Sequence, residues 1–285
     1  HTAQGAVAWA VSLTAVPWIA LPAYALFGPL RGAPFTEAMH KARDAARAAR
    51  PALTRAECRD AAEAALWAPL EKLTPAPTLT ASSVSLLIDG DAIFGAMIEA
   101  IDKARSHIFV QFYIVRDDRI GRDVAERLAG RAREGLRVRF LYDEVGARNV
   151  PASYWSALRS AGVELRAFSL VSRLPKVLRL NFRNHRKIVA VDSHLAIVGG
   201  SNLGDEYLGR DPAIGAWRDT AVSLEGAAAA EIEAIFLEDW IWTGGAAASR
   251  APSQPPPTGD VPVLILPTGP VDPSPACTLA FLHVL

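Results

Sequence analysis

The sequence predicts an α/β fold, with helices on both faces of one sheet, preceded by an N-terminal transmembrane helix. Three observations lead to this fold class. Residues 2–30 carry no charged side chain, apolar and amphipathic segments alternate from Val84 to Trp242, and a Gly-, Ala-, Ser- and Pro-rich linker follows at residues 246–260. Strands that alternate with helices in this way are typical of a sheet that is covered on both faces.

The N-terminal segment, residues 1–31, contains an uncharged run that is long enough for one membrane-spanning helix. The stretch from Ala6 to Leu30 exceeds the roughly 20 residues that a helix needs to cross the hydrocarbon core. Pro17 and Pro22 would kink this helix, which membrane helices tolerate. A signal peptide or a buried core helix is the alternative, but a signal peptide has a short apolar region with a cleavage site close behind it.

Residues 32–80 are predicted to form a basic helical linker. The basic side chains after the apolar run are Arg31, Lys41, Arg43, Arg47, Arg50, Arg55 and Arg59. By the positive-inside rule they place the following domain in the cytoplasm, and they suit an anionic membrane surface. A solvated helix face is the competing interpretation. Thr54 and Glu57 have the spacing of a capping box and predict a second helix that runs toward Leu73.

The main domain is predicted at residues 81–245. We expect strands at Val84–Ile88, Ile108–Val115, Val138–Tyr142, Val163–Phe168, Lys187–Val191, Ala196–Val198 and Ala221–Leu224. We expect helices at Ala92–Ala104, Arg122–Glu134, Tyr154–Ala161 and Ala227–Trp242. After the linker, a strand at Val261–Leu266 and an apolar stretch at Leu279–Leu285 repeat the pattern that opens the domain. Residues 261–285 are therefore predicted to begin a second, truncated copy.

Composition argues against some classes of function. Thirty basic residues balance thirty acidic ones, whereas a general nucleic-acid binder is usually basic. The two cysteines, Cys58 and Cys277, lie far apart in the sequence and predict neither a disulfide framework nor a zinc site. A reducing compartment for the domain is consistent with this cysteine usage.

The densest chemistry lies in residues 181–219. His185 and Lys187 are two residues apart, so on a strand their side chains point to the same face. An imidazole can attack phosphorus while a fixed lysine neutralises the phosphoryl oxygens. Asn202 adds a neutral donor, and Gly200 lets the backbone come close to a ligand. Each motif alone would be a surface pair or a plain turn, but their occurrence together favours a catalytic site.

These motifs resemble those of a known superfamily. His185-x-Lys187-x4-Asp192, followed by Gly-Gly-Ser-Asn, is similar to the catalytic motif of the phospholipase D superfamily. The flanking segments that are similar to its bacterial cardiolipin synthase branch are Phe109–Ile114, Leu141–Glu144, Leu203–Tyr207 and Trp217–Asp219. The resemblance covers essentially the whole chain. It implies a phospholipase D-like α-β-α sandwich and a transfer reaction between two phosphatidylglycerol molecules that gives cardiolipin and glycerol.

The resemblance also implies a role for each matching residue. His185 would be the nucleophile that forms a phosphohistidine, and Lys187 and Asn202 would bind the phosphate oxygens. Asp219 resembles the acidic residue that orients the histidine. Asp192 is part of the motif, but it usually holds the local loop and strand. The mechanism requires neither a metal nor a cofactor.

Substrate contacts are predicted from Gly200 and Ser201 in the glycine-rich turn and from Arg183 and Arg186 beside the histidine. The two arginines belong to a basic cluster that also contains Arg173, Lys176 and Arg179. Such a cluster suits anionic headgroups, because guanidinium groups bind phosphate in a bidentate manner. Apolar side chains alternate with these charges, which indicates a segment lying against the membrane. A solvated basic loop is the alternative.

The resemblance implies a second catalytic half, whose motif the sequence does not contain. Superfamily enzymes build one active site from two such motifs, and none of the other histidines is followed two residues later by lysine. The expected partner is a second phospholipase D-like half in a full-length chain, or a second copy in a homodimer. The alternatives are a phosphodiester hydrolase, a nuclease-like dimer and a catalytically incomplete membrane-anchored module. The expected location is the bacterial inner membrane, with anionic phospholipid and no nucleic acid as partner.

Overall fold

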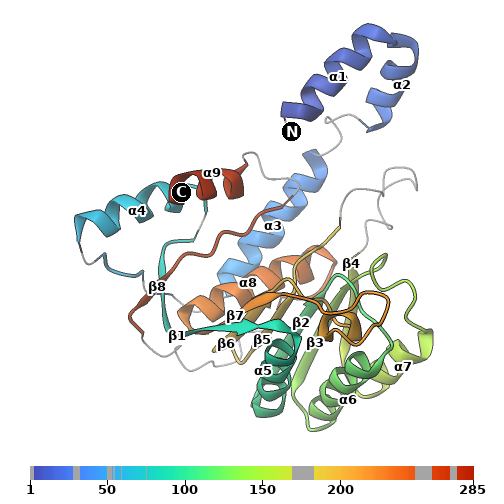
Figure 1. Cartoon of the computed structure of the whole chain (residues 1–285), viewed down its shortest axis with the longest axis vertical. Coiled ribbons are helices and arrows are strands. Elements are labelled where there is room, and N and C mark those ends of the chain that lie inside the picture. The colour runs from blue at the N-terminus through green and yellow to red at the C-terminus, as the bar shows by residue number, and fades with distance from the viewer. Residues whose placement is uncertain are drawn as a thin grey trace.

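The structure is a computed structural model that describes residues 3–27, 33–49, 53, 55–58, 60–74, 76–168, 183–247, 259–269 and 275–285. Its centre is one mixed eight-stranded sheet with the order β4-β3-β2-β5-β6-β7-β1-β8 (Figure 1). The strands are β1 (Leu79–Ile88), β2 (His107–Phe112), β3 (Arg137–Asp143), β4 (Glu164–Phe168), β5 (Ile188–Val191), β6 (Leu195–Gly199), β7 (Thr220–Gly226) and β8 (Val261–Val263). Strands β2, β3 and β4 run parallel, and the other neighbouring pairs are antiparallel.

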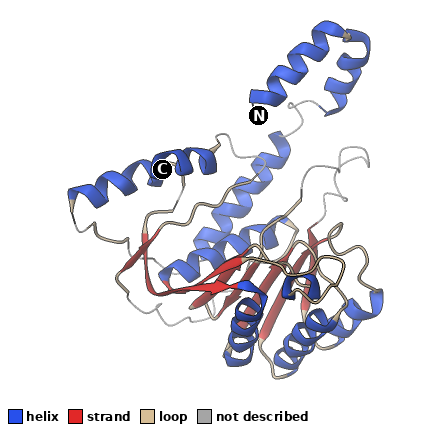
Figure 2. Cartoon of the chain, in the orientation of Figure 1, coloured by secondary structure: helices blue, strands red, loops and turns tan. Residues whose placement is uncertain are grey.

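Helices cover both faces of this sheet, which confirms the predicted α/β class (Figure 2). The helices on one face are α5 (Asp89–Lys103), α6 (Arg119–Arg133) and α7 (Ala152–Ser160). In α6, for example, Ile120, Val124 and Leu128 are buried at a spacing of four residues, so one stripe of the helix meets the sheet. Helix α8 (Ala227–Trp242) covers the other face.

The sheet divides the apolar core into two parts. Phe112 and Phe140 lie in the part under α5, α6 and α7, whereas Phe109 and Phe236 lie in the part under α8. Because successive side chains of a strand point to opposite faces, Phe109 and Phe112 of the same strand enter different parts. All six residues of β2 are buried, which explains why this strand has a nearly continuous apolar sequence.

The N-terminal run differs from its prediction. It forms two helices of 13 and 11 residues, α1 (Ala3–Ala15) and α2 (Pro17–Phe27), in place of one long helix. Pro17 has no backbone N–H and occupies the first position of α2, where a proline favours the start of a new helix. The two helices fold against each other, with the rings of Trp9 and Tyr24 edge to face at 5.1 Å. Among the described residues, no helix combines the length and apolar character needed to cross a membrane.

The basic linker contains a helix that packs on the main domain. Met39, Ala42 and Ala46 of α3 (Ala33–Ala49) are buried at a spacing that forms one helix face, and this helix packs along α8. Arg43, predicted to be one of the membrane-facing cations, instead pairs with Glu238 of α8, with Nε 3.1 Å from Oε2. Helix α3 therefore shields the outer side of α8, which explains why α8 is buried over almost its whole length.

The predicted capping box does not start the second linker helix. Helix α4 (Ala61–Glu71) begins after Asp60, whose carboxylate accepts a 2.8 Å hydrogen bond from the backbone N–H of Glu63. Glu57 lies before the helix in irregular structure, and Thr54 is outside the described residues. Asp60 is itself a favourable N-cap residue, and it satisfies one of the free N–H groups of the first turn.

The segment after the Pro-rich linker joins the same sheet. Strand β8 pairs antiparallel with Leu79–Ala81 at the start of β1, and α9 (Ala276–Val284) contacts α4, with His283 Nε2 3.0 Å from the carbonyl oxygen of Leu66. Within the described residues, β8 extends the first sheet and α9 packs on the linker helix α4. The predicted start of a second domain at residue 261 stays a prediction.

Candidate active site

Five strand ends meet at one edge of the sheet. The register pairs Gln111 with Ile188, Ile188 with Val198, and Gly199 with Ala221. Ile88, the last residue of β1, pairs with Thr220 at the start of β7. The segments next to these strand ends therefore gather at this edge, which we call the site edge. They contain His185, Lys187, Gly200, Ser201, Asn202 and Asp219.

His185 is exposed at the site edge and rests on an aromatic ring. Its imidazole stacks on Tyr113, with ring centroids 4.1 Å apart and planes inclined by 20°. Tyr113 directly follows β2, the strand that pairs with β5. Stacking fixes the plane of the imidazole while leaving its nitrogen atoms accessible, which is the arrangement that a nucleophile requires.

Lys187 lies beside the histidine, as the spacing predicted. Its Nζ donates a 2.6 Å hydrogen bond to the carbonyl oxygen of His185 and lies 5.8 Å from the ring centroid of Tyr113. Burial lowers the pKa of the Lys187 ammonium, and the negative charge of Asp219 partly opposes this shift. A half-buried cation held near an exposed imidazole is suited to bind a phosphoryl group.

Asp219 is held by the glycine-rich turn. Its carboxylate accepts hydrogen bonds from Ser201 Oγ at 2.8 Å, from the Thr220 backbone N–H at 2.7 Å and from Trp217 Nε1 at 3.3 Å. A Cβ atom at Gly200 would lie 2.5 Å from Asp219 Oδ1, so only glycine leaves room for the carboxylate. The described residues show no hydrogen bond between Asp219 and His185, so the orienting role stays a prediction.

Asp89 also holds Asp219, and the sequence did not single it out. Its Oδ1 accepts a 3.0 Å hydrogen bond from the backbone N–H of Asp219, and its own N–H donates to the Asp219 carbonyl oxygen at 3.1 Å. Asp89 has a left-handed backbone with φ of 63°, which aspartate tolerates better than most residues. The Asp-Gly pair after β1 was interpreted only as the end of a strand.

Asn202 is buried, and its carboxamide is engaged within the protein. Its Oδ1 accepts a 3.0 Å hydrogen bond from the backbone N–H of Ile114, and its Nδ2 donates to Tyr207 Oη at 2.8 Å. These bonds tie the turn after β6 to the segment after β2. In this structure Asn202 organises the backbone of the site edge, and its predicted contact with phosphate is not tested.

Asp192 lies at the other edge of the sheet. It follows β5, whereas His185 and Lys187 precede that strand. Its carboxylate accepts backbone hydrogen bonds from Arg105 at 2.7 Å, Ser106 at 2.8 Å and His107 at 2.9 Å. The structure thus separates Asp192 from the other candidate residues and gives it the task of holding the loop before β2.

The two predicted arginines differ. Arg186 points to the α8 side of the sheet, where its guanidinium pairs with Asp239 at 2.8 Å, so the structure does not place it with His185 as a headgroup ligand. Arg183 is half-buried two residues before His185. The other members of the predicted cluster, Arg173, Lys176 and Arg179, lie outside the described residues.

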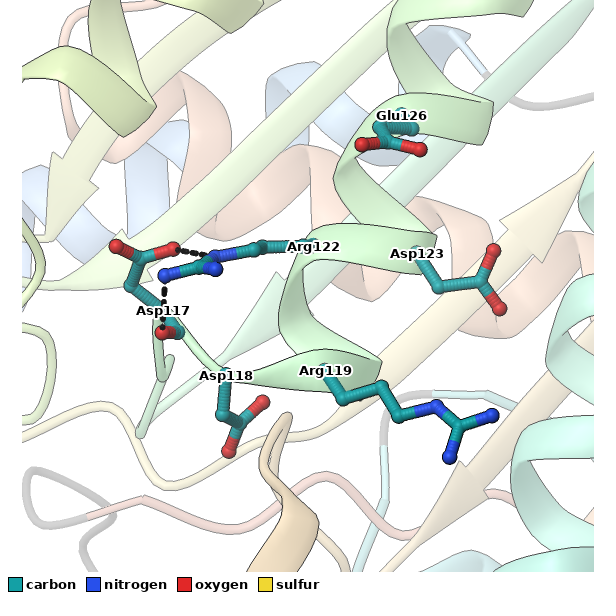
Figure 3. Close-up of a pocket in the computed structure, with 6 residues that line it drawn as sticks. All are labelled: Asp117, Asp118, Arg119, Arg122, Asp123 and Glu126. Atoms are coloured by element: carbon teal, nitrogen blue, oxygen red, sulfur yellow. Dashed lines mark hydrogen bonds and ion pairs between the residues drawn. The ribbon is translucent and has the colours of Figure 1, made fainter.

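A hollow of about 390 Å³ lies at the start of α6 but contains neither His185 nor Lys187 (Figure 3). It is lined by Asp117, Asp118, Arg119, Arg122, Asp123 and Glu126. Arg122 turns toward Asp117, and the two side chains form a 2.6 Å ion pair. Carboxylates outnumber guanidinium groups in this lining, so its charge is unfavourable for a phosphate ester.

Tyr113 is the clearest residue of the site edge that sequence reasoning missed. It belongs to the segment Phe109–Ile114 that carried the family resemblance, but it was treated as part of a buried strand. Its position directly after β2 would have been a usable signal, because side chains after a strand end lie at the sheet edge where β5 begins.

Comparison with known proteins identifies the family. Residues 97–240 match the family model described as "Cardiolipin synthase, PLD-like domain". Cardiolipin synthase A of Pseudomonas putida (strain GB-1) is 38% identical over 306 residues, which cover 100% of this chain and 61% of that protein. Cardiolipin synthase A of Pseudomonas aeruginosa (strain LESB58) is 40% identical over 298 residues and is covered to 60%. The chain thus spans about three fifths of the length of these relatives.

Solved structures also resemble the chain. Phosphatidylserine synthase of Haemophilus influenzae Rd KW20 has a TM-score of 0.47 and 18% identity, over 61% of this chain and 41% of that one. The phospholipase D family member Nuc of Salmonella typhimurium has a TM-score of 0.43 and 20% identity, over 56% of this chain and 95% of that one. The match to the family model confirms the predicted resemblance. Because this model covers half of the sequence, the chain belongs to the cardiolipin synthase family of phospholipase D-like domains.

Proposed function

We propose that the chain is the nucleophilic half of a cardiolipin synthase. The observation that carries the proposal is the exposed imidazole of His185, stacked on Tyr113 and flanked by the Lys187 ammonium, in a chain of the cardiolipin synthase family. Attack by a His185 nitrogen on the phosphorus of phosphatidylglycerol would form a phosphohistidine and release glycerol. Attack by a hydroxyl of a second phosphatidylglycerol would then give cardiolipin and free the histidine.

Each residue of the site edge has a task in this reaction. Lys187 would neutralise the phosphoryl oxygens as negative charge develops on them. Asp219 favours the cationic form of Lys187 and would stabilise the imidazolium of the attacking His185 electrostatically. Gly200 and Ser201 shape the turn that holds this carboxylate, and Arg183 would contact the anionic headgroup.

The acid–base half of the reaction would come from a partner. Glycerol leaves as an alkoxide unless a second group protonates it, and the same group would later activate the incoming hydroxyl. A second His-x-Lys motif is absent from the sequence, and the curated relatives are longer than this chain. We propose that the partner is a second phospholipase D-like half in a longer protein, with a second copy of this chain as the alternative.

The α1–α2 hairpin would hold the protein at the membrane. Val7, Val11, Trp18, Ile19 and Leu21 expose between 58% and 86% of their surface on these two helices. Exposed apolar side chains of this kind are favourable in the interfacial layer of a bilayer, and such helices need not span it. The proposed location is the cytoplasmic face of the bacterial inner membrane, where phosphatidylglycerol is available.

The reaction is tested with radiolabelled phosphatidylglycerol vesicles. The 285-residue chain alone is expected to produce little or no cardiolipin, because it contains one motif. The chain joined to the second half encoded by its gene is expected to form labelled cardiolipin and glycerol, and acid-labile label on His185 in a rapid quench. Robust synthesis by the chain alone would contradict the two-half proposal, and a joined protein without labelled His185 would contradict the nucleophile assignment.

Product analysis in the same experiment separates the alternatives. Phosphatidic acid in place of cardiolipin would identify a hydrolase that uses water as acceptor. A downstream reading frame without a second His-x-Lys-x4-Asp motif, together with a protein that binds vesicles but forms no product, would identify a catalytically incomplete membrane module.

A further inference from the structure

Three hydrogen bonds converge on one buried carboxylate behind the site edge. Asp239 of α8 exposes 1% of its surface, and its Oδ2 accepts from Gln111 Nε2 at 2.7 Å, Asn184 Nδ2 at 2.7 Å and Arg186 at 2.8 Å. The proposed reaction assigns no task to this group. A buried carboxylate oxygen with three donors is held firmly, because each bond is strong where water is excluded.

Two of the three donors flank the proposed nucleophile. Asn184 and Arg186 are the neighbours of His185 in the chain, and the Arg186 backbone N–H donates to Asn184 Oδ1 at 3.0 Å. The Asn184 backbone N–H also donates to Asp143 Oδ2 at 3.2 Å. Residues 183–187 form neither helix nor strand, so these side-chain ties replace the regular backbone bonds that would otherwise fix His185.

The third donor, Gln111, connects Asp239 to the strand that precedes Tyr113, the ring stacked on His185. Gln111 lies in β2, two residues before Tyr113, and Tyr113 stacks on the imidazole. Asp239 thus holds, from one atom, the segment that carries His185 and the strand that carries its stacking partner. Displacement of this carboxylate would move the two rings relative to each other.

We propose that Asp239 is a positioning residue that sets the orientation of His185 against Tyr113 and, through it, the rate of attack on phosphorus. The predicted effect on the reaction rate rests on the proposed function, whereas the predicted effect on the orientation of His185 does not. Attack requires the nitrogen to approach phosphorus in line with the leaving group, and a misplacement of about 1 Å can cost roughly 100-fold in rate.

The neighbouring residue on α8 supplies a matched control. Glu238 is also buried, with 3% of its side chain exposed, but it pairs with Arg43 of α3 on the side away from the sheet. Asp239→Asn and Glu238→Gln each remove one buried negative charge from the same helix. They differ in whether the charge that is removed binds the neighbours of His185 in the chain.

The orientation test uses the 285-residue chain and requires no lipid. With ¹³C-labelled histidine, the imidazole protons of His185 are expected to show the upfield ring-current shift of a stacked ring. Asp239→Asn is expected to reduce this shift. Asn184→Ala removes the bonds of Asn184 to Asp239 and to the Arg186 backbone N–H, but Gln111 and Arg186 stay bound to Asp239, so a smaller reduction is expected. Glu238→Gln is expected to leave the shift unchanged, even if it lowers the melting temperature as much.

The rate test uses the chain joined to its second half. Asp239→Asn is expected to lower kcat by about 100-fold with KM changed less than about threefold, since the headgroup contacts stay in place. Equal effects of Asp239→Asn and Glu238→Gln, or an unchanged His185 signal in both Asp239→Asn and Asn184→Ala, would overturn the proposal. If Asp239→Asn reduces the ring-current shift and Glu238→Gln does not, but the wild-type joined protein has no transferase activity, the positioning role is upheld and the proposed reaction is rejected.

Discussion

The two edges of the sheet that β5 connects are built in opposite ways. At the site edge, before β5, His185 is exposed and Lys187 is half-buried. At the other edge, after β5, the Asp192 carboxylate accepts three backbone hydrogen bonds. Nearby, the buried Glu233 accepts from Ser193 N and Oγ at 2.9 Å and bonds His107 Nε2 at 2.9 Å. At the site edge the polar groups are available to a ligand, whereas at the other edge they form hydrogen bonds within the protein.

This difference explains the spacing of the motif. Lys187 and Asp192 are separated by the four residues of β5, which places their Cα atoms about 16 Å apart along an extended strand. One motif therefore contains a chemical part and a structural part, and the strand between them holds the two at a constant distance. Substitutions at the two ends should consequently affect different properties of the protein.

Replacement of His185 by Asn should have the largest effect on activity. Without the nucleophile, phosphatidyl transfer by the chain joined to its second half is expected to fall by about 10³-fold or more. Stability should change by less than about 1 kcal/mol, because the imidazole is exposed and only its stacking is lost. Denaturant titration and the vesicle assay measure the two quantities, and more than a tenth of the wild-type rate would contradict the assignment.

Replacement of Asp192 by Ala should give the reverse pattern. Three backbone N–H groups, of which only that of His107 is partly buried, would lose a charged acceptor, which is expected to cost about 1–3 kcal/mol of unfolding free energy. Activity per folded molecule should stay within about twofold, since Asp192 does not reach the site edge. Asp192→Asn is the control, because it keeps an acceptor oxygen and tolerates the left-handed backbone at φ of 55°.

Regular elements with strong periodicity could be predicted from the sequence. The helix expected at Ala227–Trp242 has these bounds in the structure, and the buried strand β2 was expected at Ile108–Val115 and found at His107–Phe112. These segments are set by local pattern and by Gly226 before α8, with φ of 94°. The closeness of His185 and Lys187 at the site edge was also predictable from their spacing of two residues, whereas their catalytic roles stay a prediction.

Tertiary contacts account for what the sequence did not reveal. Tyr113 lies 72 residues before His185 in the sequence (185 − 113), and Asp89 lies 130 residues before Asp219. Only the folded sheet brings the members of each pair together. The pattern could not show that Arg186 turns to α8. The single long N-terminal helix was wrong, because hydrophobicity alone does not reveal a chain reversal at Pro17.

Substitution of Asp219 by Asn should move the alkaline limit of phosphate binding. Burial already lowers the pKa of Lys187, and the Asp219 charge opposes that shift, so removal of the charge should lower the pKa of Lys187 further. Lysine binds phosphate as a cation, and binding is lost as the pH rises through its pKa. The loss should therefore occur at lower pH in the variant, as followed by ¹³C-methyl-lysine NMR, whereas Asp192→Asn should leave the Lys187 titration unchanged.

Substitutions at Tyr113 should have the smallest effect on the reaction rate. They also test most directly how the site edge differs from the other edge. Tyr113→Phe keeps a ring beneath His185 and near Lys187, so the rate of the joined enzyme should stay within about threefold. Tyr113→Leu removes the flat surface, and the rate should fall by roughly tenfold, which corresponds to about 1.4 kcal/mol of lost orientation. Equal rates for Phe and Leu would mean that the aromatic face does not orient the histidine. The position of His185 would then depend on the hydrogen bonds of its segment to Asp239 and Asp143, and the site edge would in that respect resemble the hydrogen-bonded edge at Asp192.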